Sequence, residues 1–109
     1  MTRSLDDLTA LVAQVSDIYA DIFDIERDGD WFLLKLQEEL GELTAEHLRL
    51  SKRGRIKGRS EAEIAQARDD EAADLLAFLL LYARHHQIDL HAALERKWFD
   101  YLRGEKETR

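Results

Sequence analysis

Apolar residues recur every three or four positions along four stretches of the chain, and short polar segments separate them. The first stretch begins at Leu5 and ends between Phe23 and Glu26, with Ser4 placed to cap its N-terminus and Asp7 three residues further on. Its apolar positions are Leu5, Leu8, Val12, Val15, Ile18, Tyr19 and Ile22. This spacing is typical of one face of a helix, so we predict a first helix here.

The second stretch predicts a helix from about Trp31 to Leu50, with Asp30 as its candidate N-cap. A row of leucines follows one side of it: Leu33, Leu36, Leu40, Leu43 and Leu50. The next ten residues, 51–60, have the sequence SKRGRIKGRS, with five basic residues, two glycines and no acid. This composition indicates a loop.

The third stretch is the longest and runs from about Glu61 to His85. Ser60 and Glu63 form an S-x-x-E capping box at its start, which predicts a helix beginning there. From Leu75 to Ala83 this helix is apolar on all sides. We therefore expect neighbours to enclose it, either other helices of the chain or a second subunit.

The fourth stretch predicts a helix from Leu90 to about Arg103, with Asp89 as its cap and Gly104 as its stop signal. The remaining residues, 105–109, are expected to form a frayed tail. The chain contains no proline and only five glycines, which favours helices over turn-rich β folds. We predict an all-α, four-helix bundle-like protomer that oligomerises, with residues 1–109 forming a single domain.

Composition limits the kind of protein further. A chain of 109 residues has room for one small core, and it lacks cysteines for disulfides, so subunit association or a bound ion is the expected support. The net charge of -7 argues against a general nucleic-acid binder. Residues 1–14 lack a continuous apolar segment, and the apolar run 75–83 is under half of the roughly 20 residues that a bilayer requires. We expect a soluble, cytoplasmic protein with no membrane contact.

Acidic side chains gather on the two central predicted helices. The second helix carries Glu38, Glu39 and Glu42, and the third carries Asp70, Glu71 and Asp74. At about 100° per residue, Glu71 and Asp74 lie about 60° apart and inside the apolar stripe. Glu39 falls at the border of the leucine row and Glu42 just beyond it, whereas Glu38 points further toward solvent. The two inward pairs can therefore face each other.

Four ionised carboxylates brought together need a cation, because each uncompensated buried charge costs several kcal/mol. Lys35 is the only nearby base on the second helix. A set of oxygen ligands favours Mg²⁺, with Mn²⁺ possible, over zinc. A di-iron bundle would require Glu-x-x-His on two helices, and none of the four histidines has a glutamate three positions before it.

The assembled motifs resemble a known family. The segment 35–43 matches K-L-x-E-E-x-G-E-L, and 71–76 matches E-x-x-D-L-L. Residues 87–90 and 92–97 match the turn and helix that follow. Together they resemble the MazG-like, all-α nucleotide pyrophosphohydrolases over about residues 31–97.

The resemblance implies Mg²⁺-dependent hydrolysis of a nucleoside triphosphate to the monophosphate and pyrophosphate, as in the cleansing of nucleotide pools. Transferred by position, it implies Glu39, Glu42, Glu71 and Asp74 as metal ligands. It implies Glu38 as the base that orients or deprotonates the attacking water. The family usually forms homodimers or homotetramers.

A triphosphate also needs cations, because the carboxylates alone would repel it. Lys35 and Arg103 are candidate substrate contacts, and the resemblance adds Lys97. The loop supplies five further candidates with solubility as an equal alternative: Lys52, Arg53, Arg55, Lys57 and Arg59. Trp31 is a candidate to stack on the base, as are Phe32, Trp98 and Tyr101, although aromatic residues at helical spacing more often belong to the core.

Two other interpretations remain open. Phosphoribosyl-ATP pyrophosphohydrolase has a related helical core, but its helix after E-x-x-D typically carries Tyr-His where this chain has Ala77 and Phe78. The second alternative is a non-catalytic helical dimerisation protein in which the acids are structural and the run 75–83 forms the interface.

Overall fold

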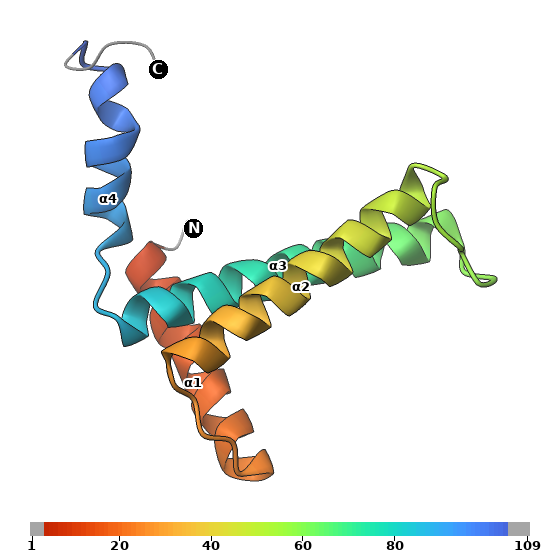
Figure 1. The fold of residues 1–109 in the computed structure, drawn as a ribbon, viewed down its shortest axis with the longest axis horizontal. Coiled ribbons are helices and arrows are strands. Elements are labelled where there is room, and N and C mark those ends of the chain that lie inside the picture. The colour runs from red at the N-terminus through yellow and green to blue at the C-terminus, as the bar shows by residue number, and fades with distance from the viewer. Residues whose placement is uncertain (1–3, 105–109) are drawn as a thin grey trace.

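Regular structure in the chain is entirely helical over residues 4–104, the range that the computed structural model describes (Figure 1). The elements are α1 (Leu5–Phe23), α2 (Gly29–Leu50), α3 (Glu61–His85), α4 (Leu90–Lys97) and a 3₁₀ turn, η1 (Phe99–Tyr101). The predicted all-α class is confirmed. The tail predicted at 105–109 lies outside the described residues.

Capping boxes fix the starts of α1 and α3 where the sequence predicts them. The Ser4 hydroxyl accepts a hydrogen bond from the Asp7 amide at 3.1 Å, and the Asp7 carboxylate accepts one from the Ser4 amide at 3.3 Å. Ser60 and Glu63 repeat the arrangement at 3.1 and 3.0 Å. Each pair satisfies amide groups that a helix start would otherwise leave without partners.

The start of α2 differs from the prediction by two residues. Asp28, not Asp30, is the N-cap, and its carboxylate accepts a hydrogen bond from the Trp31 amide at 2.8 Å. Gly29 can occupy the first helical position because it has no side chain: a Cβ there would lie 2.5 Å from Nε2 of His86. A larger residue at this position would require the exposed His86 ring to move.

The fourth helix is shorter than predicted. It ends at Lys97 rather than near Arg103, because the backbone of Trp98 (φ -116°) departs from helical values and the chain tightens into η1. Three of the next four residues are aromatic, and aromatic side chains lose rotamer freedom in a helix. Gly104 stands just beyond this turn with φ of +71°, a conformation that glycine adopts without strain.

The three longer helices form the packed body of the protein. α2 and α3 run antiparallel as a hairpin closed by the loop 51–60, and α1 crosses α3 at the opposite end of the hairpin (Figure 1). The core there is formed by Ala13, Phe32 and Leu81, with Val12, Trp31, Phe78 and Tyr82 packed around it. α4 leads away from this body and packs mainly against η1. One chain therefore does not form the expected four-helix bundle.

The leucine row of α2 is buried only in part. Phe32, Glu39 and Glu46, spaced seven residues apart, are the buried positions of α2. The leucines at 33 and 40 are exposed, whereas those at 36, 43 and 50 are half-buried. Within one chain the run 75–83 is enclosed only in part, since Leu76 and Leu79 are exposed, and its coverage by a second subunit stays a prediction.

The molecule is extended for its size. The radius of gyration is 17.1 Å, whereas a compact chain of this length has about 13 Å. Among the described residues, no helix combines the length and apolar character needed to cross a bilayer.

Candidate metal centre

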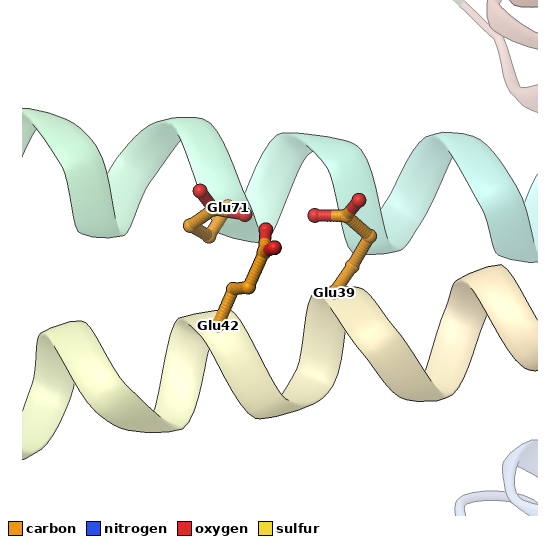
Figure 2. A group of neighbouring side chains, drawn as sticks. All are labelled: Glu39, Glu42 and Glu71. Carbon is orange, nitrogen blue, oxygen red and sulfur yellow. The ribbon is translucent and has the colours of Figure 1, made fainter.

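Three carboxylates meet between the two helices of the hairpin. Glu39 and Glu42 project from α2, one turn apart, and Glu71 projects from α3 toward them (Figure 2). One oxygen from each lies within 4.8 Å of the others. Spacing of three residues places both α2 side chains on the same side of the helix, and the hairpin brings Glu71 opposite them.

Two oxygens of this cluster lack partners. Glu39 is only 7% exposed, and Glu71 is half-buried. The Oε2 atoms of both side chains are buried and make no hydrogen bond within the described part of the chain. Buried polar atoms are nearly always satisfied in proteins, so these two atoms need a partner such as a shared proton, a water molecule or a cation.

The electrostatics of the cluster agree with its burial. Burial raises the pKa of Glu39 to about 8, and the adjacent carboxyl groups of Glu71, Glu42 and Asp74 act in the same direction. Hydrogen bonding to Glu39 lowers the pKa of Glu71, but burial and the neighbouring Glu42 outweigh it, so that pKa is also raised. Without a cation, the cluster therefore holds a proton near neutral pH.

The other two predicted acids lie beside the cluster rather than in it. Asp74 is exposed, and it lines the same cavity as Glu39. Glu38 is exposed and pairs with Lys35, whose Nζ lies 3.0 Å from Oε2 of Glu38. Glu38 lies apart from the inward acids, as predicted, but Asp74 is less enclosed than its position in the apolar stripe indicates.

A cavity of about 390 Å³ opens next to the carboxylates, where α1 meets the hairpin. Its wall consists of Val12, Val15, Ser16, Tyr19, Trp31, Lys35, Glu39, Asp74, Ala77, Phe78 and Leu81. The rings of Trp31 and Phe78 meet edge to face with centroids 5.9 Å apart. Nζ of Lys35 lies 6.0 and 5.8 Å from these two ring centroids. The cavity thus combines an apolar wall, one cation and two acids.

The cavity places Trp31 and Lys35, both predicted substrate contacts, beside the acids. The wall contributed by α1, including Val15 and Tyr19, was not predicted. An apolar helix face gives no sign of whether it covers a core or lines a cavity, so the sequence offered no signal for these residues.

Other predicted cations lie elsewhere. The cavity wall includes neither Lys97 nor Arg103, and Arg103 pairs with Asp100 in the segment that leads away from the body. In the loop, Arg59 binds the buried Glu46 at 2.7 Å, and Lys52 binds Glu61 at 3.2 Å. Within one chain, the structure therefore brings Lys35 alone of these cations to the acids.

No family model matches the chain, and neither curated proteins nor solved structures give a significant match. What the site binds must therefore be inferred from its own geometry. Carboxylate oxygens are the ligands of hard divalent cations, and three of them converge here with two buried oxygens unsatisfied. The donor set suits such a cation.

Proposed function

We propose that the chain is a Mg²⁺-dependent nucleoside triphosphate pyrophosphohydrolase, which releases pyrophosphate and a nucleoside monophosphate. The observation that supports this most is the carboxylate cluster beside an apolar cavity of about 390 Å³ that carries one lysine at its wall. The motif resemblance at 35–43 and 71–76 adds the reaction class. Removal of unwanted nucleotides is the role that we propose for it.

Glu39, Glu42 and Glu71 would hold the cation, and Asp74, which lines the cavity with Glu39, is a candidate fourth ligand. A hard cation gives the two buried Oε2 atoms the partner they lack, and Mn²⁺ would serve as well as Mg²⁺. When bound, the ion supplies positive charge that offsets the charge on the phosphate oxygens.

The cavity would receive the nucleoside end of the substrate. Trp31 and Phe78 offer flat apolar surface for a base, and Lys35 is placed between these rings and the acids. The ammonium group of Lys35 can bind a phosphate oxygen there, which opposes the repulsion between substrate and carboxylates.

Glu38 is the proposed base. Its carboxylate is exposed and lies outside the cation cluster, so it is available to take a proton from water that attacks the α-phosphorus. In the absence of substrate Lys35 holds it at 3.0 Å. If the lysine turns to a phosphate oxygen, the same movement releases Glu38 to act on water.

We also propose that the chain works as a homo-oligomer, a dimer or tetramer. Large apolar side chains remain exposed on α1, on the leucine row of α2 and on α3. Such surface on a small protein is typical of subunit contacts.

The function is tested by measuring pyrophosphate release from a panel of canonical and modified nucleoside triphosphates with Mg²⁺. Glu38→Gln should lower turnover about 100-fold or more, the usual effect of removing a general base, and leave Mg²⁺ binding intact. Glu71→Gln should weaken both. Asp69→Asn is the matched control, because Asp69 is an exposed acid of α3 that pairs with Arg68 outside the cluster.

Equal activity in the Glu38→Gln or Glu71→Gln variant and the wild type would contradict the assigned roles. A panel without any release would contradict the function as stated, and phosphoribosyl-ATP would be the next substrate to assay. If Mg²⁺ and Mn²⁺ also fail to change the melting temperature, the non-catalytic interpretation is favoured.

A further inference from the structure

Helix α1 carries a second apolar face in addition to the one that packs on the hairpin. Its inner side is buried through Ala13 and Ala20. Its outer side presents Leu11, Val15, Ile18 and Ile22, which are between 41% and 69% exposed. These four residues are spaced four, three and four apart, the a/d pattern by which helices pair. We call them the outer seam of α1.

A second exposed apolar row lies at the other end of the chain. Leu94, Trp98 and Leu102 follow one another at intervals of four through α4 and η1, and they are between 38% and 85% exposed. We call residues 90–102 the arm, since this segment leads away from the body (Figure 1). The seam spans 12 residues and the arm 13, so they would be about 18 and 20 Å long if helical.

The exposed surface of the chain is large enough to provide an interface. The chain has 8504 Å² of accessible surface, whereas a compact monomer of its mass has about 6,200 Å². The excess is larger than the roughly 800 Å² that each partner buries in a standard interface. A second copy of the chain can therefore cover the seam and the arm together.

The charge distribution favours one pairing of surfaces over another. α1 contains four aspartates and no lysine or arginine, so two α1 helices would repel each other. Between Leu90 and Gly104 there are three basic residues and two acidic ones. Pairing of the arm with α1 brings opposite net charges together, which favours this partner and its orientation.

We propose that the arm of a second copy packs along the outer seam of α1 and brings Lys97 to the rim of the cavity. A two-fold axis makes the exchange mutual, so two copies close without leaving a free seam or arm. Val15 belongs to both the seam and the cavity wall, so a helix on the seam borders the cavity. The role of Lys97 rests on the proposed function, whereas the packing of the arm does not.

Engineered cysteines test the packing, because the chain has none of its own. Ile18→Cys and Leu94→Cys are made in separate chains, one of which carries a size tag, and the chains are mixed and mildly oxidised. We expect a disulfide-linked heterodimer on mixing. Neither variant alone should crosslink, since each has only one of the two facing positions.

Each other result contradicts the proposed packing. Crosslinking of Ile18→Cys with itself would indicate that two α1 helices pair. A dimer by sedimentation that forms no mixed crosslink would place the interface elsewhere. A disulfide within single chains of the double variant, with none between chains, would show that the arm folds onto its own α1.

Association is measured by sedimentation with a matched pair of variants. Ile18→Glu places a charge in the seam and should raise the dissociation constant tenfold or more. Ala10→Glu adds the same charge to an exposed position of α1 outside the seam and should change it little. Equal effects of the two variants would contradict the seam as the interface.

Mixed variants test the delivery of Lys97. Glu71→Gln and Lys97→Ala should each have strongly reduced activity alone, but a mixed dimer contains one cavity with intact acids and the partner's lysine. Random exchange should restore about one quarter of wild-type activity. No restoration would contradict delivery by the partner. If the wild type hydrolyses no nucleotide, the proposed function fails, and the cysteine experiment still decides the packing.

Discussion

Glu39 shows what a single residue can reveal about a site. It is a carboxylate that is almost fully enclosed, between two helices and next to two other acids, and one of its oxygens has no partner. A neutral acid tolerates this place better than an ionised one, which is why the pKa rises to about 8. A divalent cation would reverse that preference, because it stabilises the ionised form.

The stability of the metal-free protein should therefore decrease as the pH rises, because Glu39 loses its proton. The folded state keeps the Glu39 proton up to about pH 8, whereas the unfolded state loses it near pH 4.5. The contribution of this proton to the free energy of unfolding is therefore complete below pH 4.5 and is lost as the pH rises to 8. Between pH 5 and pH 8 in EDTA, the melting temperature of the wild type should fall relative to Glu39→Gln by on the order of 5 °C. Parallel melting curves of the two proteins across this range would contradict the prediction.

Addition of Mg²⁺ should release a proton at neutral pH. The cation binds ionised carboxylates, so Glu39 must lose its proton, and the affinity for Mg²⁺ should rise from pH 6 to pH 8. Calorimetry in buffers of different ionisation enthalpy measures this release. Asp69→Asn serves as the control and should release the same amount as the wild type.

At the scale of elements, the helix starts depend on single polar side chains. The cap of α2 is Asp28, which accepts the Trp31 amide, whereas Asp30 lies inside the first turn. Asp28→Ala should lower the free energy of unfolding by about 1 kcal/mol. Asp30→Ala should lower it by only a few tenths, since that acid contributes through the helix dipole. Urea unfolding of both variants measures the difference, and a reversed order would restore Asp30 as the cap.

The loop between α2 and α3 is fastened by a buried acid. Glu46 accepts hydrogen bonds from Arg59 at 2.7 Å and from Arg49 at 2.8 Å, and these arginines hold its pKa below the ordinary value. Arg49 also donates to the Arg55 carbonyl oxygen at 3.0 Å. Two of the basic side chains near the loop therefore position the chain rather than face a substrate.

Loss of the Glu46 charge should weaken this end of the hairpin. Glu46→Gln leaves two arginines without their counter-charge at a buried site, which should lower the free energy of unfolding by about 1–3 kcal/mol. Glu61→Gln removes an exposed pair with Lys52 and should change it by less than about 1 kcal/mol. Denaturant unfolding tests the contrast, and equal losses would contradict the role of burial.

At the scale of the whole molecule, the chain is extended rather than closely globular. Its radius of gyration is 17.1 Å, its fourth helix leads away from the body, and apolar rows remain uncovered on α1 and α2. A small protein gains stability by burying such surface, and a second copy offers matching surface without a further partner.

Thermal stability should therefore depend on protein concentration. If copies associate in the folded state, mass action raises the melting temperature as concentration increases, whereas a monomer melts at one temperature. A hundredfold dilution should lower it measurably, and the Ala10→Glu variant should follow the wild type. A melting temperature that is independent of concentration, together with a monomer by sedimentation, would contradict the proposed oligomer.

The sequence by itself determined the local features of this protein. Capping boxes at Ser4 and Ser60, apolar periodicity and the polar loop 51–60 act within a few residues, so the helices and most of their ends could be predicted. The grouping of Glu39, Glu42 and Glu71 was also predictable, since helical spacing fixes which side of a helix each acid occupies.

Only the tertiary structure decided which face of each helix is buried, which is exposed and which lines the cavity. Periodicity gives the direction of a side chain but not its neighbour. The leucine row of α2 was expected inside but is exposed at Leu33 and Leu40, and Asp74 is more exposed than its stripe indicates. The cavity wall on α1 and the separate course of α4 depend on contacts between segments far apart in sequence. Local sequence patterns do not distinguish between the apolar faces of a helix. Packing between segments far apart in the sequence determines which face is covered, and here the packing of α1 on the hairpin places a cavity beside the acids.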